Sequence, residues 1–108
     1  MIGKTFQMDM NQYNLDHIKN LLNNKKPFLA EKYRVEEIGI FGSFIHDNAD
    51  EGSDIDILVS FQEPIDYFDF LELEEYLTGL LNIPVDLVEK QSLKPHIGSR
   101  VLREVEML

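Results

Sequence analysis

Two acids one residue apart, Asp54 and Asp56, open an apolar run, and ten residues before them Gly42 and Ser43 close an earlier one. In an extended strand the side chains of Asp54 and Asp56 point to the same face. Like charges held this close repel each other unless a cation lies between them. Mg²⁺ is such a cation, because it binds carboxylate oxygens together with water and substrate phosphates. The pair therefore predicts a magnesium site.

A third acid, Asp86, interrupts the apolar run of residues 83–89. In a strand, Val85 and Leu87 point to one face and Asp86 points to the other. If this strand lies beside the strand of residues 54–61, three carboxylates converge on one spot. An acid within a run of Val, Ile and Leu costs stability unless it is paired. Three such acids are therefore more typical of a site than of an accident.

The Gly-Ser pair supplies the second half of the candidate site. Gly42 follows an expected strand, where a glycine permits a sharp turn and a close approach to a ligand. The hydroxyl and N–H of Ser43 can receive a phosphate. A nucleoside triphosphate carrying Mg²⁺ would use such a turn beside the acids. Each motif alone is common, so the prediction rests on their combination.

Helices are expected before the first strand. One spans residues 10–24, with Asn11 or Asn14 as its N-cap. Pro27 is expected to end this helix and to open a short second one over residues 27–34, because proline is favoured in a first helical turn.

The remaining elements alternate between strands and helices. Strands are expected at 36–42, 54–61 and 83–89, and helices at 65–81 and 93–108. The pattern predicts an α+β fold, with a small mixed β-sheet flanked by helices. No linker rich in Gly or Ser interrupts the chain, so residues 1–108 are expected to form a single domain.

The charge is uneven along the chain. Twenty acids stand against ten bases, giving a net charge of −10, and fifteen of the acids lie between residues 35 and 89, where there is no Lys or Arg. Such a segment repels nucleic acid and attracts metal cations or a basic protein. It is equally compatible with a solvated acidic surface that keeps the protein soluble.

Composition also bounds the location. The chain has no cysteine, which excludes disulfides and thiolate metal sites and suits a reducing cytosol. It has no apolar stretch near the ~18 residues that a membrane span needs, and its start lacks the apolar region of a signal peptide. We therefore expect a cytoplasmic protein with no membrane partner.

Together these motifs resemble the signature of the nucleotidyltransferase superfamily related to DNA polymerase beta. Length and layout resemble its minimal branch, the MNT domain proteins, over residues 15–108, and the tail 93–108 resembles that branch's closing helix. The resemblance implies a polymerase beta-like fold in which the acids line one open face.

The resemblance also implies a function: transfer of AMP from ATP to a protein hydroxyl, with pyrophosphate leaving. Minimal members often pair, as antitoxins, with a HEPN domain ribonuclease toxin and modify a toxin tyrosine, which implies a hetero-oligomer. By this resemblance Asp54, Asp56 and Asp86 are catalytic and bind two Mg²⁺ ions, or Mn²⁺, and Gly42 and Ser43 bind the nucleotide.

One position departs from the family pattern. His46 stands where many relatives carry a basic residue shortly after Gly-Ser, and a neutral histidine gives little to a triphosphate. The departure bears on nucleotide affinity more than on catalysis. Four bases could compensate from the last helix: Lys90, Lys94, Arg100 and Arg103.

Two other functions stay open. The chain could be a non-catalytic antitoxin that neutralises a basic partner by binding. It could also be a small-molecule adenylyltransferase whose acceptor pocket comes from another subunit. Three aromatic residues, Tyr67, Phe68 and Tyr76, are expected to pack within the helix of residues 65–81 and not to stack on a base.

Overall fold

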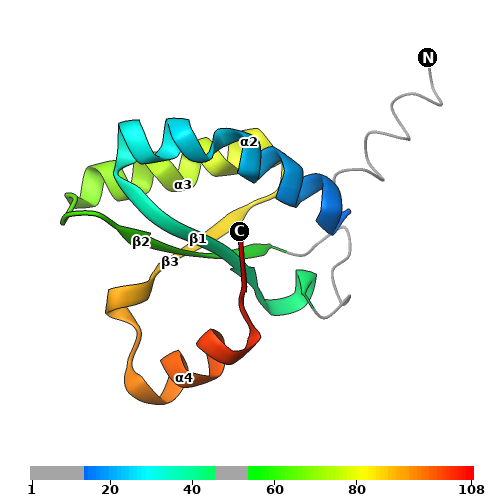
Figure 1. Cartoon of the computed structure of the whole chain (residues 1–108), viewed down its shortest axis with the longest axis vertical. Helices are drawn as coiled ribbons and strands as arrows, with labels where there is room; N and C mark the ends of the chain where they lie inside the picture. The colour runs from blue at the N-terminus through cyan, green and yellow to red at the C-terminus, as the bar shows by residue number, and fades with distance from the viewer. Residues whose placement is uncertain (1–13, 46–53) are drawn as a thin grey trace.

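The computed structural model describes residues 14–45 and 54–108 (Figure 1). The helices in this part are α2 (Leu15–Tyr33), α3 (Tyr67–Leu81) and α4 (Pro95–Glu104), with short 3₁₀ turns η1 (Gly42–Phe44) and η2 (Lys90–Ser92). The strands are β1 (Val35–Phe41), β2 (Ile55–Phe61), β3 (Val85–Glu89) and β4 (Glu106–Met107).

The four strands form one mixed sheet in the order β3-β2-β1-β4. β1 is antiparallel to both β2 and β4, whereas β2 and β3 are parallel. The parallel pair is possible because α3 returns the chain from the end of β2 to the start of β3. The predicted α+β fold, a small mixed sheet flanked by helices, is confirmed.

The main core lies between the sheet and two helices. α2 and α3 lie side by side on one face of the sheet, and α4 lies on the opposite side (Figure 1). α2 and α3 each direct an apolar stripe at the sheet. The fully buried side chains of this core include Leu22, Leu29, Ile40, Ile57, Leu73 and Leu77. This packing holds β1, β2 and β3 in fixed register.

Helix α2 continues through Pro27, so the expectation of two helices was wrong. A proline inside a helix removes one backbone hydrogen bond and costs ~3 kcal/mol. Pro27 is exposed, and so is Asn23, whose carbonyl would otherwise accept from position 27 and can bond water instead. The buried residues on both sides of Pro27 share one face of a continuous helix, which offsets the cost: Ile18, Leu22, Leu29 and Tyr33.

The end of the chain also departs from expectation. The expected helix of residues 93–108 ends at Glu104, and β4 then pairs with Gly39 and Ile40 of β1. Gly39 makes this possible, because a Cβ there would lie 2.7 Å from both Val105 Cγ2 and Met107 Sδ. The missing side chain of Gly39 leaves a notch that the returning strand fills. This contact joins residues far apart in the sequence, so the helical periodicity of residues 93–108 could not predict it.

A polar contact ties α2 to α3. The hydroxyl of Tyr33 donates to Glu72 Oε2 at 2.9 Å, and burial together with this carboxylate raises the pKa of Tyr33 to about 12. Tyr76 packs beside it, with its ring centroid 5.1 Å from that of Phe28, as predicted for that residue. Among the described residues, no helix is long and apolar enough to cross a membrane.

Two glycine-to-alanine changes test the notch in β1. Gly39→Ala should destabilise the protein by about 1–3 kcal/mol, the usual cost of overpacking, because the new methyl group displaces Val105 and Met107. Gly79→Ala is the matched control, because a Cβ there meets nothing within 4 Å in α3 and should stabilise by about 0.5–1 kcal/mol. Urea unfolding measures both, and equal effects would contradict the notch.

The raised pKa of Tyr33 predicts a loss of stability at high pH. The stabilising hydrogen bond to Glu72 is present below the ordinary tyrosine pKa of 10 and is lost as pH rises through about 12. Tyr33→Phe should therefore cost about 1 kcal/mol at neutral pH, and the difference from wild type should shrink as pH rises above 10. Urea unfolding across this pH range measures the difference, and one that stays constant would show that the hydrogen bond is not its source.

Candidate active site

The parallel pairing of β2 with β3 brings two of the predicted acids together. Asp56 and Asp86 are register partners, one step after Ile55 and Val85. Ile55 and Val85 are buried on the side of α2 and α3, so the alternation of strand side chains turns both acids to the opposite face. The predicted convergence of these two carboxylates is therefore what the sheet produces.

The acids differ in their surroundings. Asp56 is half-buried, whereas Asp86 and Asp54 are exposed, and Asp54 lies just before β2 begins. Burial raises the pKa of Asp56, and the charges of Asp86 and Asp54 and a hydrogen bond with the Asp86 side chain raise it further. The three acids therefore form one electrostatic cluster centred on Asp56, in which negative charge is unfavourable.

Gly42 holds the turn that faces this cluster. Its φ is +81°, in the left-handed region that favours glycine, and a Cβ there would fall on Asp56 Oδ2. Phe44, two residues on, is buried in the core and anchors the turn. A glycine is thus required at position 42 for two reasons, its left-handed backbone conformation and its close contact with Asp56. This contact places the predicted turn against the predicted acids.

Two predicted residues are less fully described. The backbone of Ser43 belongs to η1, but its side chain lies outside the described part of the structure, as does the whole of His46. Their contribution to the site stays a prediction from the sequence.

The acids fit a hard dication in their chemistry. Their donor atoms are carboxylate oxygens, which Mg²⁺ prefers, and a dication would relieve the repulsion around Asp56. As they are placed, no three Asp, Glu, His or Cys side chains among residues 14–45 and 54–108 form a group that could hold a metal. The assignment of these acids as metal ligands therefore stays a prediction.

The bases near the end of the chain are not all available to a ligand. Lys90 lies in η2 and not in the last helix, and its Nζ donates to Glu37 Oε1 at 3.1 Å. The buried Ser60 donates to the same oxygen. The hydrogen bond from Lys90 lowers the pKa of Glu37 most, and the hydrogen bond from Ser60 lowers it further. Lys90 therefore fastens η2 to the sheet. Arg100 lies 3.8 Å from Glu104 on α4.

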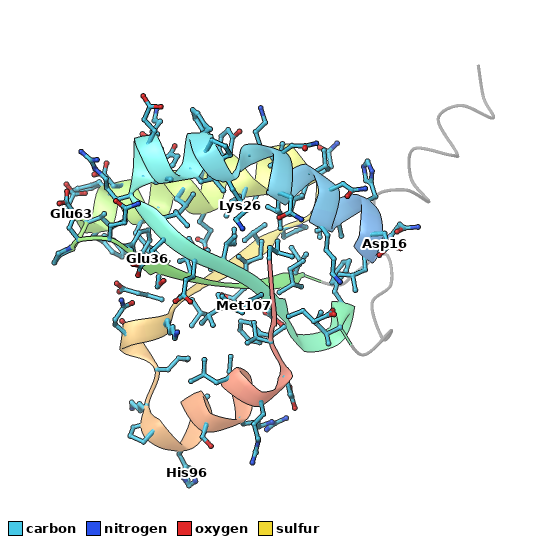
Figure 2. All side chains as sticks on the ribbon, viewed as in Figure 1. Asp16, Lys26, Glu36, Glu63, His96 and Met107 are labelled. Atoms are coloured by element: carbon cyan, nitrogen blue, oxygen red, sulfur yellow. The ribbon has the colours of Figure 1, made fainter. Side chains whose placement is uncertain are left out.

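Several side chains point away from any shared site. Asp16 and Glu63 lie at opposite sides of the molecule, Glu36 lies beside β1, and His96 points outward from α4 (Figure 2). The excess of acids is therefore distributed over several elements, and the cluster around Asp56 is a small part of it.

The expectation that Tyr67 and Phe68 pack within their helix was wrong. Their exposed fractions are 69% and 79%, although Tyr76 on the same helix is packed. The N-cap explains the difference: the side chain of Asp66 accepts from the N–H of Asp69, so α3 begins at Tyr67, at the edge of the molecule. An acid before an apolar run was the available signal, because it marks the first helical turn.

Similarity to known proteins agrees with this geometry. The family described as Nucleotidyltransferase domain matches residues 22–107. Protein adenylyltransferase MntA of Thermococcus cleftensis is 50% identical over 91 residues, which cover 84% of this chain and 92% of that protein.

Two solved toxin–antitoxin complexes contain similar chains. One, crystallised with AMP-PNP, has a TM-score of 0.66 at 28% identity and covers 78% of this chain and 69% of its own. The other combines a tri-AMPylated HEPN toxin of Shewanella oneidensis with an MNT antitoxin. It has a TM-score of 0.57 at 25% identity and covers 93% of this chain and 70% of its own.

The repulsion around Asp56 predicts the effect of removing its charge. In metal-free buffer, Asp56→Asn should raise the free energy of unfolding by about 0.5–2 kcal/mol, the usual gain from an improved charge arrangement. Glu75→Gln is the control: it removes the charge of an exposed acid on α3, away from the cluster, and should leave the free energy of unfolding nearly unchanged. Urea unfolding measures both, and a loss of stability in Asp56→Asn would contradict the electrostatic cluster.

Proposed function

The chain belongs to the nucleotidyltransferase family, and on that basis we propose that it transfers AMP from ATP to a tyrosine hydroxyl of a HEPN domain toxin and so acts as an antitoxin. The reaction is Mg²⁺-dependent, with Mn²⁺ as a possible substitute. Residues 1–108 act as one domain, within a hetero-oligomer with the toxin.

One observation carries this proposal: the half-buried Asp56 lies beside Asp86 and against the Gly42 turn. A purely structural role gives no reason to gather negative charge at a half-buried position. The pattern is typical of a site whose ligand brings positive charge. For a nucleoside triphosphate, that charge comes from the metal ions bound to it.

The proposed roles follow from position. Asp54 and Asp56 would hold two metal ions, and Asp86 would hold one of them. When bound, the ions would neutralise charge on the triphosphate and on the leaving pyrophosphate. Gly42 and Ser43 would contact the nucleotide, and the absent side chain of Gly42 lets this turn lie directly against Asp56.

Asp86 has a second proposed role, as general base. The acceptor hydroxyl oxygen forms a bond to the α-phosphorus of ATP, and the bond from that phosphorus to the oxygen bridging to pyrophosphate breaks. The hydroxyl proton passes to a carboxylate oxygen of Asp86. Asp86 is exposed on an edge strand, so an acceptor from another protein can reach it and the proton can pass on to water.

The relatives support the substrates. The protein from Thermococcus cleftensis is a protein adenylyltransferase, one similar complex contains an ATP analogue, and the other contains an AMPylated HEPN toxin. The uneven charge of this chain also suits a basic partner. These points favour a protein acceptor over a small molecule.

Asp86→Asn separates an enzyme from a binding protein. The variant should still bind the proposed partner, a HEPN domain protein encoded beside this chain, but should transfer AMP about 10²–10⁴-fold more slowly, because a general base is lost. Glu75→Gln is the control for a lost exposed charge and should transfer AMP at the wild-type rate. Intact mass of the HEPN protein after incubation with ATP and Mg²⁺ measures the transfer.

A binding-only antitoxin would behave differently. Asp86→Asn would then protect cells from the toxin as well as wild type does, and neither protein would add AMP to the HEPN protein. That result would remove the enzymatic proposal.

A further inference from the structure

A pocket opens between α3 and β3, at the edge of the sheet. The C-terminal half of α3 is tied to β3, because Val85 N donates to Thr78 Oγ1 at 3.1 Å and Leu87 N donates to Glu74 Oε2 at 2.9 Å. These bonds occupy two outward-facing N–H groups of the edge strand. Beyond Glu74, toward its first turn, α3 separates from the strand.

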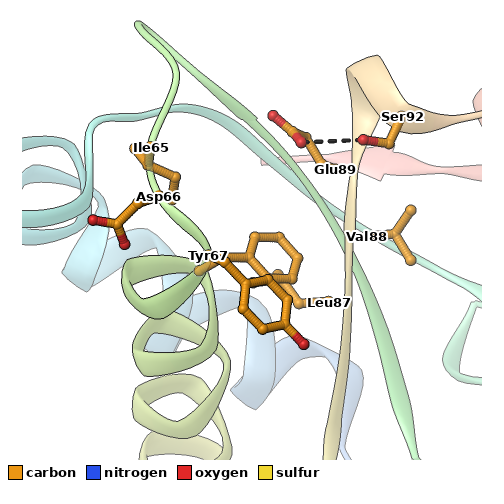
Figure 3. Close-up of a pocket in the computed structure, with 8 residues that line it drawn as sticks. Ile65, Asp66, Tyr67, Leu87, Val88, Glu89 and Ser92 are labelled. Atoms are coloured by element: carbon orange, nitrogen blue, oxygen red, sulfur yellow. Dashed lines mark hydrogen bonds between the residues drawn. The ribbon is translucent and has the colours of Figure 1, made fainter.

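The separation leaves a pocket of about 480 Å³ (Figure 3). Its walls are largely apolar: Tyr67 and Phe70 come from α3, and Leu87 and Val88 come from β3. Phe70 also packs on Phe61 of the core, with 6.4 Å between ring centroids, so this wall is fixed. Tyr67 is mostly exposed at the mouth.

The charged groups of the pocket share one sign. The charged residues that line it are both acids, Asp66 and Glu89. Asp66 Oδ1 accepts from the N–H of Asp69 at the start of α3, and in Figure 3 its carboxylate points away from the pocket, whereas Glu89 Oε1 accepts from Ser92 Oγ at 3.1 Å, which holds the Glu89 carboxylate at the pocket. The pocket thus presents apolar walls with fixed negative charge.

The place of the pocket relates it to Asp86. Leu87 and Val88 directly follow Asp86, and Val88 lies on the same face of the strand as Asp86, so the pocket at this edge reaches that face within ~7 Å of Asp86 along the strand. The Gly42 turn follows β1, two strands away across the sheet. In the proposed reaction the nucleotide lies by that turn and the acceptor lies by Asp86, so the pocket is on the acceptor's side.

We propose that this pocket docks the acceptor protein through an apolar side chain flanked by Lys or Arg, and so positions the acceptor hydroxyl at Asp86. This inference rests on the proposed function and adds to it the residues that choose the acceptor. The apolar side chain fills the space between Tyr67 and Leu87, and the basic residue meets Glu89. An exposed tyrosine over an apolar pocket is the type of residue that dominates binding energy at interfaces.

Tyr67→Ser tests the docking role, with Phe68→Ser as its matched control. Both residues are exposed aromatics in the first turn of α3, but only Tyr67 lines the pocket, so neither change should harm folding. For the co-encoded HEPN protein as acceptor, Tyr67→Ser should raise KM at least about tenfold. Phe68→Ser should change it less than about twofold. Cleavage of ATP to AMP and pyrophosphate without the acceptor should stay at the wild-type rate for both.

Glu89→Gln tests the charge. It should raise KM for the HEPN protein and flatten its dependence on salt, because one contact with a basic group is lost. Glu75→Gln, an acid outside the pocket, should change neither property.

Several results would overturn the inference. An unchanged KM for the HEPN protein in Tyr67→Ser would do so while wild type still transferred AMP, which leaves the proposed function intact. A rise in KM for ATP would assign the pocket to the adenine ring, and loss of a homodimer in Tyr67→Ser would assign it to a second copy of this chain. If wild type binds the HEPN protein without transferring AMP and Tyr67→Ser weakens that binding at least about tenfold, docking holds and the proposed chemistry fails.

Discussion

The in-register parallel pairing of β2 with β3 is the constraint on which the site depends. It places Asp56 beside Asp86 and keeps both on the face opposite α2 and α3. A slip of one residue in either strand would turn its acid into the core and its buried Ile or Leu into water. The apolar packing of α2 and α3 on Ile55, Ile57 and Leu87 therefore fixes the geometry of the acids, although none of these residues is polar.

The same packing supplies the stability that the acids remove. Burial and two neighbouring carboxylates make the charged form of Asp56 unfavourable, and the left-handed Gly42 turn brings backbone against it. The core of Leu, Ile and Phe side chains offsets this cost, because its contribution to stability depends on the apolar area that it buries. That area lies on the face of the sheet opposite the acids. A carboxyl whose pKa is raised by burial and by neighbouring charges is typical of functional sites.

The placement of Asp56 beside Asp86 and against the Gly42 turn could be predicted from the sequence because it depends on local patterns. Strand alternation predicts which face Asp54, Asp56 and Asp86 occupy, and an interrupted apolar run is visible in the letters alone. The errors arose where a distant contact outweighs a local rule. Pro27 stays inside α2 because the core needs residues on both sides of it. β4 forms because Gly39 leaves a notch, which Val105 and Met107 fill from far along the chain.

The exposed aromatics were missed for a related reason, and they bear on how an acceptor is chosen. Periodicity predicts a helical stripe but not where the partner element ends, and α3 extends past the part of β3 that Thr78 and Glu74 hold. Because Asp86 lies on an edge strand, the acceptor side of the site has no further strand among the described residues to shape it. Selectivity must then come from what borders that edge, and in the described part of the chain the apolar pocket with Tyr67 and its two acids borders it. The acids proposed to be catalytic and the pocket proposed to dock the acceptor can thus vary independently, since the acids depend on strand register and the pocket depends on the first turn of α3.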